Sequence, residues 1–155
     1  MELEKEGDGF VIGPTAYFHR TYDETMGLLI EARNYAIYHD SIDSRTLSPQ
    51  IRLQVSYESL RVTSRLTQVM AWLLAQKAVH AGELTLEQVA SEEYALSGGT
   101  VCTDPSGPEN EALPNGLRSL LDRSLRLYVR VARLDQQVRR YNLEHTEMQR
   151  EGAAP

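Results

Sequence analysis

The 155-residue sequence has one cysteine, Cys102, and no long hydrophobic run. A single cysteine excludes an internal disulfide and fits a reducing compartment. The longest apolar run, residues 69–75, is far shorter than the roughly 20 residues that a membrane-spanning helix needs. The first residues are acidic, whereas a secretory signal is basic at this point. We therefore expect a cytoplasmic protein with no membrane segment.

Basic residues are missing between Lys77 and Arg118, a stretch that holds seven acidic residues. The sign reverses after this stretch, because the last third of the chain is rich in arginine. The formal net charge of −6 disfavours binding to the phosphate backbone of nucleic acids, which requires a positive surface. We therefore do not expect nucleic acid as a partner.

The sequence also lacks the residue groupings on which catalysis and metal binding depend. Cys102 has no catalytic signature around it, and no Glu-x-x-His tetrapeptide of a di-iron helical bundle is present. The histidines are scattered through the chain, at His19, His39, His80 and His145. We accordingly predict no catalytic residue, no metal site and no cofactor. A small-molecule enzyme would require a deep polar pocket inside the fold.

The clearest structural signal is a long helix expected over residues 49–82. Ser48 can cap its start, Pro49 suits the first helical position, and Gly82 suits the end. Apolar residues recur on one face at helical spacing, namely Val55, Val62, Leu66, Val69 and Leu73. Three polar residues of this helix are expected to face water: Arg61, Arg65 and Gln68.

A third helix is expected from about Pro114 to Glu147, after a first helix over residues 15–38. Its apolar seam repeats every three or four residues and is interrupted only at Ser124. The seam consists of Leu117, Leu120, Ser124, Leu127, Val131, Leu134, Val138 and Tyr141. A second stripe beside it indicates packing or dimer contacts by Leu121, Leu125 and Tyr128.

These segments predict an all-α fold, an antiparallel three-helix bundle with up-down-up topology and one very long central helix. We expect a flexible N-terminal arm at residues 1–14, one helical domain at 15–147 with a long loop at 97–113, and a disordered tail at 148–155. A monomer of this kind leaves apolar stripes uncovered. A homodimer is therefore expected.

One side of the third helix carries a strip of arginines: Arg123, Arg126, Arg130, Arg133 and Arg140. Two interpretations stay open. The arginines can form a solvated face whose charges balance acidic residues elsewhere in the protein, or they can bind an acidic partner.

The middle-helix sequence SYESLRVTSRLTQVMAWLLAQKAVHAGELT resembles the RcdA family, the alphaproteobacterial regulators of CtrA degradation. MGLLIEARNYA and LPNGLRSLLDRSLRLYVRVARLDQQV resemble the same family, so the similarity covers most of residues 18–138. The resemblance implies a dimeric three-helix bundle without catalytic activity, an adaptor in cell-cycle-controlled proteolysis. It would help deliver transcription or replication regulators to the ClpXP protease, with ClpX-associated adaptor proteins and a cargo regulator as partners. The alternative hypothesis is a DNA-associated helical transcription regulator.

Overall fold

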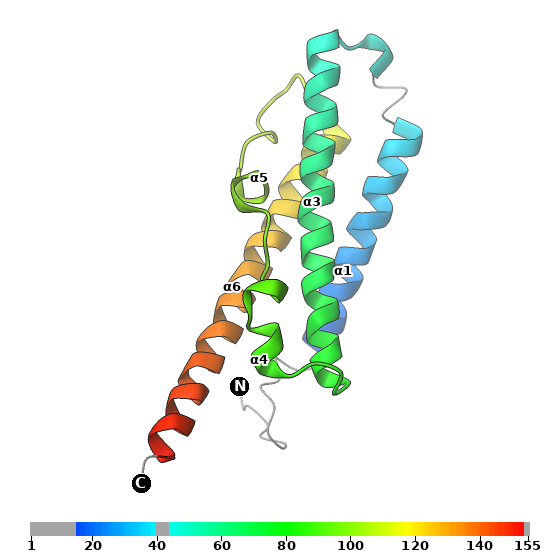
Figure 1. Cartoon of the computed structure of the whole chain (residues 1–155). Helices are drawn as coiled ribbons and strands as arrows, with labels where there is room; N and C mark the ends of the chain where they lie inside the picture. Colours follow the sequence, from blue (N-terminus) through cyan, green and yellow to red (C-terminus); the bar gives the residue numbers. More distant parts are fainter. Residues whose placement is uncertain (1–14, 40–43, 154–155) are drawn as a thin grey trace.

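The computed structural model describes residues 15–39 and 44–153, which fold into three long helices and several short ones (Figure 1). The described residues contain no strand. The all-α prediction with a long central helix is confirmed. The elements are α1 (Thr15–Asn34), the π-helical turn η1 (Tyr35–His39), the 3-10 turn η2 (Ser44–Thr46), α3 (Pro49–His80), α4 (Leu86–Val89), the 3-10 turn η3 (Glu92–Tyr94), α5 (Gly99–Thr103) and α6 (Asn115–Gly152).

The ends of α3 follow the local sequence as predicted. The Ser48 side chain accepts a hydrogen bond from the Ile51 N–H at 3.3 Å, and Pro49 occupies the first turn, where its missing N–H leaves nothing unpaired. Past the helix end, Gly82 has a φ of +74°, which glycine adopts without strain. The helix therefore spans 32 residues between two encoded ends.

The last helix runs in the direction opposite to the one predicted. α1 is antiparallel to α3, but α6 is parallel to α3 (Figure 1). Contacts confirm the parallel direction, since Arg65 of α3 reaches Leu121 and, further along both helices, Trp72 reaches Asp135. We call residues 81–114 the return segment. The up-down-up expectation is wrong for α6 because the return segment runs back along the bundle to the end where α3 begins, and α6 starts there.

Two further boundaries differ from the prediction. α6 continues to Gly152, so residues 148–152 are helical and not a disordered tail. The sequence from 148 to 151 contains no glycine or proline to end the helix earlier. The expected loop at 97–113 contains the short helix α5. The predicted arm at residues 1–14 lies outside the described residues.

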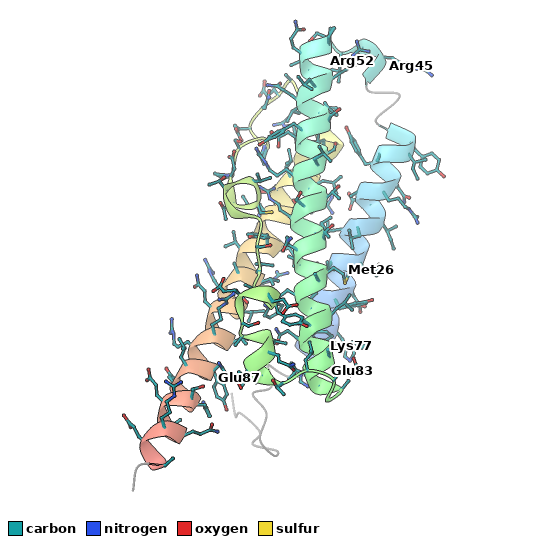
Figure 2. All side chains as sticks on the ribbon, in the orientation of Figure 1. Met26, Arg45, Arg52, Lys77, Glu83 and Glu87 are labelled. Carbon is teal, nitrogen blue, oxygen red and sulfur yellow. The ribbon has the colours of Figure 1, made fainter. Side chains whose placement is uncertain are left out.

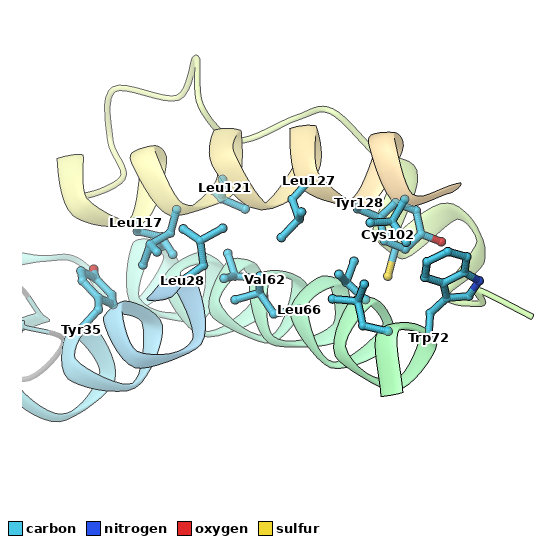
Figure 3. Packing of buried hydrophobic residues seen from close by; sticks show 14 of the residues in the cluster. Leu28, Tyr35, Val62, Leu66, Trp72, Cys102, Leu117, Leu121, Leu127 and Tyr128 are labelled. Carbon is cyan, nitrogen blue, oxygen red and sulfur yellow. The ribbon is translucent and has the colours of Figure 1, made fainter. Parts of the chain in front are cut away.

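The core lies between α3 and α6, and α1 closes one side. In Figure 3, Leu117, Leu121 and Leu127 of α6 face Val62 and Leu66 of α3. These side chains are almost completely buried, as the apolar seams predicted. Each buried leucine contributes roughly 1.5–3 kcal/mol through removal of apolar surface from water.

All three polar residues that were expected to face water on α3 instead bind the return segment. Arg65 is only 1% exposed and Arg61 only 3%. Gln68 is half-buried, and its side-chain oxygen accepts hydrogen bonds from the Ser97 N–H at 3.2 Å and hydroxyl at 2.9 Å. The prediction fails because the return segment covers the side of α3 on which these residues lie.

Arg65 makes the most extensive of these contacts. Its Nε donates to the Cys102 carbonyl at 2.9 Å, one terminal nitrogen donates to the Leu121 carbonyl at 2.9 Å, and the other donates to the Asp104 carbonyl at 2.6 Å. The Ser124 hydroxyl lies 3.3 Å from the same guanidinium. One side chain thus joins α3, the return segment and α6.

Arg61 binds the next residues of the return segment. It donates to the Ser106 carbonyl at 3.0 Å and forms ion pairs with Asp104 at 3.1 Å and with Glu58 at 3.0 Å. Burial lowers the pKa of Arg65, and the neighbouring charge of Arg61 lowers it further. Burial also raises the pKa of Glu58, an effect that the Arg61 charge opposes. Two buried cations are therefore held close together by acceptors from the return segment.

We expect Gly107→Ala to destabilise the protein by about 1–3 kcal/mol. Gly107 has a φ of +119°, and an added Cβ would lie 2.7 Å from Cδ1 of the fully buried Leu121. Urea unfolding at one fixed protein concentration measures the change. The matched control is Gly27→Ala on α1, where the added methyl group meets nothing within 4 Å and should stabilise the helix by up to about 1 kcal/mol. Equal effects of the two variants would contradict this account.

We expect Arg65→Met to lower the free energy of unfolding by about 2–4 kcal/mol, because buried carbonyl groups lose their hydrogen-bond donor. The control is Arg20→Met on α1, an exposed arginine, which should change stability by less than about 0.5 kcal/mol. Urea unfolding compares the two. A loss for Arg65→Met no larger than that of the control would show that the buried arginine is not required.

Candidate protein-interaction surface

The predicted arginine strip on α6 divides into two rows in the structure. Arg123 and Arg130 lie on the side of α6 that faces α1. Arg123 forms an ion pair with Glu31, and Arg130 forms one with Glu24. Both acidic residues belong to α1, which is antiparallel to α6. For this row, the structure matches the interpretation that the arginines balance the charge of acidic residues elsewhere in the protein.

The pair between Arg123 and Glu31 perturbs both groups. The hydrogen bond from Arg123 holds the pKa of Glu31 below its usual range, and the same contact raises the pKa of Arg123. Because both side chains are more than 40% exposed, water and salt screen their attraction. The contact therefore aligns α1 with α6 more than it stabilises the fold.

The other row consists of Arg126, Arg133 and Arg140, and we call it the outer arginine row. All three are exposed. Arg126 pairs only with Asp122 one turn earlier, at 3.0 Å, and its side chain is 76% exposed. Among the described residues, no ion pair involves Arg133 or Arg140. Residues seven apart lie about 10.5 Å apart along a helix, so the row presents evenly spaced cations to solvent.

The predicted second stripe of α6 packs within the protomer. Leu121 and Tyr128 are buried in the core, and Leu125 is half-buried. The Tyr128 hydroxyl donates to the Ser97 carbonyl at 2.9 Å. Leu121 and Tyr128 are therefore packing residues inside one copy of the chain.

Further polar contacts, which the sequence interpretation did not single out, attach the return segment to α6 and join α3 to α6. Arg118 donates to the Pro108 carbonyl at 2.7 Å. The indole N–H of Trp72 donates to Asp135 at 2.9 Å, and Arg139 pairs with the same carboxylate at 3.2 Å. A buried indole requires an acceptor, so Trp72 was the one signal in the sequence that could have pointed to such a partner.

A small pocket lies between α1, α3 and α6. Its lining is mostly apolar and contains one titratable side chain, that of His80. The complete lining is Phe18, Thr21, Trp72, Leu73, Gln76, His80 and Leu134.

In the described part of the chain, no group of three or more histidine, cysteine, aspartate or glutamate residues is placed to hold a metal ion. Residues 15–39 and 44–153 also contain no helix that is long and apolar enough to span a membrane.

Residues 14–153 match the family described as "Protein of unknown function (DUF1465)". No curated protein matches the chain. Among solved structures, the crystal structure of RcdA from Caulobacter crescentus CB15 is similar, with 40% sequence identity and a TM-score of 0.62. The similarity covers 78% of this chain and 89% of that chain.

The family match over residues 14–153 spans all three long helices and the return segment. The similarity to RcdA agrees with the resemblance seen in the sequence. At this identity and coverage it shows common family membership and not merely a shared helical fold. The chain belongs to the RcdA family.

Proposed function

We propose that this protein is a non-enzymatic adaptor in cell-cycle-controlled proteolysis, which helps deliver transcription or replication regulators to the ClpXP protease. The observation that carries the proposal is the 40% identity to RcdA over most of both chains. The proposed partners are ClpX-associated adaptor proteins and a cargo regulator protein, and the proposed location is the cytoplasm. The active form is proposed to be a homodimer.

The surface of the molecule supports a role in protein binding. The outer arginine row offers exposed cations on one helix, and only Arg126 has an ion-pair partner among the described residues. The return segment contributes acidic residues and no basic ones to another part of the surface. Separated charge of this kind orients encounters between proteins and increases their association rate. The outer arginine row is the proposed contact for an acidic partner.

The direct test of the function is a reconstituted degradation assay. Purified ClpX and ClpP, the candidate response-regulator cargo and the ClpX-associated adaptor are combined with and without this protein. The proposal predicts faster cargo loss when the protein is added. Affinity capture from native lysate with mass spectrometry identifies the cargo beforehand, with enrichment of ClpX or a response regulator expected. Cargo loss at the same rate with and without the protein would reject the adaptor role.

We predict that Arg126→Glu combined with Arg133→Glu weakens partner capture by about 10- to 100-fold, because two attractive charges become repulsive. Circular dichroism should show unchanged helical content, since both side chains are exposed. The control combines Arg20→Glu with Arg33→Glu on α1, two exposed arginines whose reversal changes the net charge equally. Equal capture by the two double variants would exclude the outer arginine row as the contact.

A further inference from the structure

The solvent-facing side of α3 carries no charged residue between Arg52 and Lys77, which mark its two ends in Figure 2. Charged residues do occur in this part of the sequence, but Arg61 and Arg65 are buried beneath the return segment, and Glu58 pairs with Arg61. A quarter of the chain is charged, so an ordinary solvated face of this length would carry charge. We call this surface the neutral face of α3. Its exposed members are Leu53, Gln54, Ser56, Tyr57, Leu60, Thr63, Thr67, Ala71 and Leu74.

Within the neutral face, one line of residues has the spacing of a coiled-coil seam. The line alternates steps of four and three for about three and a half heptads. Its large members are strongly exposed, with Leu53 at 74%, Leu60 at 67%, Tyr57 at 50% and Leu74 at 48%. The full line is Leu53, Tyr57, Leu60, Ser64, Thr67, Ala71, Leu74 and Ala78.

The steps of four and three residues are in the same order from either end of the line. The α3 helix of a second copy, placed antiparallel, therefore presents the same spacing, and the two lines can pair in one register. In that register Leu60 of one copy faces Ala71 of the other, and Leu53 faces Ala78. In these two pairs a large side chain meets a small one, whereas Tyr57 faces Leu74, so two large side chains meet there. The small residues Ser64 and Thr67 meet at the centre, where the two helices would approach most closely.

The charges beyond the two ends favour the same orientation. Arg45 and Arg52 lie at the N-terminal end of α3, and Glu83 and Glu87 lie just past its C-terminal end (Figure 2). All four are exposed, and no ion pair among the described residues uses them. An antiparallel pair brings the arginines of one copy towards the glutamates of the other, whereas a parallel pair brings like charges together. Lys77 lies at the acidic end and is outnumbered there by the two glutamates.

We propose that two copies of this chain pair through the neutral face of α3, antiparallel, with the two-fold axis between Ser64 and Thr67. The inference rests on the homodimer of the proposed function and adds the surface, the direction and the register. Antiparallel helix dipoles also attract each other in this arrangement. The partner is a second copy because the spacing of the seam and the charges at its ends are complementary to themselves.

The first experiment measures the dimer dissociation constant by sedimentation velocity for the wild-type chain, Leu60→Glu and Leu143→Glu. Leu60→Glu places a charge in the seam opposite Ala71 and should raise the dissociation constant at least about 100-fold. Leu143→Glu makes the same chemical change at a 63% exposed position on α6 and should leave the constant unchanged. Both positions are exposed in the protomer, so neither variant should unfold it.

The second experiment fixes the register by oxidative cross-linking. The double variant Leu60→Cys with Ala71→Cys should form a covalent dimer, while either single variant should not. Each single cysteine would lie about 16 Å from its copy along the helix axis in the antiparallel register. In a parallel pair, Leu60→Cys alone would cross-link. The native Cys102 is fully buried and serves as the unreactive background.

The third experiment reverses the end charges. Arg52→Glu should weaken the dimer about 3- to 10-fold, and adding Glu83→Arg should restore it.

A monomeric wild-type chain, a Leu60→Glu variant that dimerises normally, or a cross-link from Leu60→Cys alone each overturns the proposal. These readouts use only the purified chain, so a failed degradation assay rejects the adaptor role without affecting them.

Discussion

The guanidinium of Arg65 is the contact on which the rest of the structure depends. It lies at the point where α3, the return segment and α6 meet, and it donates to a carbonyl group of Cys102, Asp104 and Leu121. Ser124 interrupts the apolar seam of α6 at this point and leaves room for the cation. A larger residue there would fill the space that the guanidinium occupies, so the break in the seam and the buried arginine are two parts of one arrangement.

This arrangement determines which surfaces remain exposed. Because the return segment is fixed along one side of α3, it brings the chain back to the end where α3 started, and α6 then runs parallel to α3. α1 occupies the second side of α3 and α6 the third. No part of residues 15–39 or 44–153 covers the fourth side of α3, which is free of charge, and the outer arginine row of α6 faces solvent. The two surfaces proposed for binding thus follow from the path of the return segment.

Local signals in the sequence were sufficient to place the three long helices, apart from the end of α6, but not to predict their direction. The start of α3 at Ser48 and Pro49 and its end near Gly82 both form as predicted, because each depends on neighbouring residues alone. The burial of Arg61 and Arg65 depends on contacts about 40 residues away and gives no periodic signal. The division of the arginine strip likewise depends on acidic residues of α1, which pair with Arg123 and Arg130 but leave the outer row exposed. The family resemblance supplied the expected function, which the residues alone did not specify.

Native-state hydrogen exchange of the return segment tests the central claim most directly. The amides of Cys102 and Asp104 donate hydrogen bonds within α5, the part of the return segment that Arg65 holds. If the buried arginine makes this segment part of the core, these amides exchange only through global unfolding and with the same free energy as the core of α3. Exchange through local opening, at a free energy well below that of α3 and α6, would contradict the account.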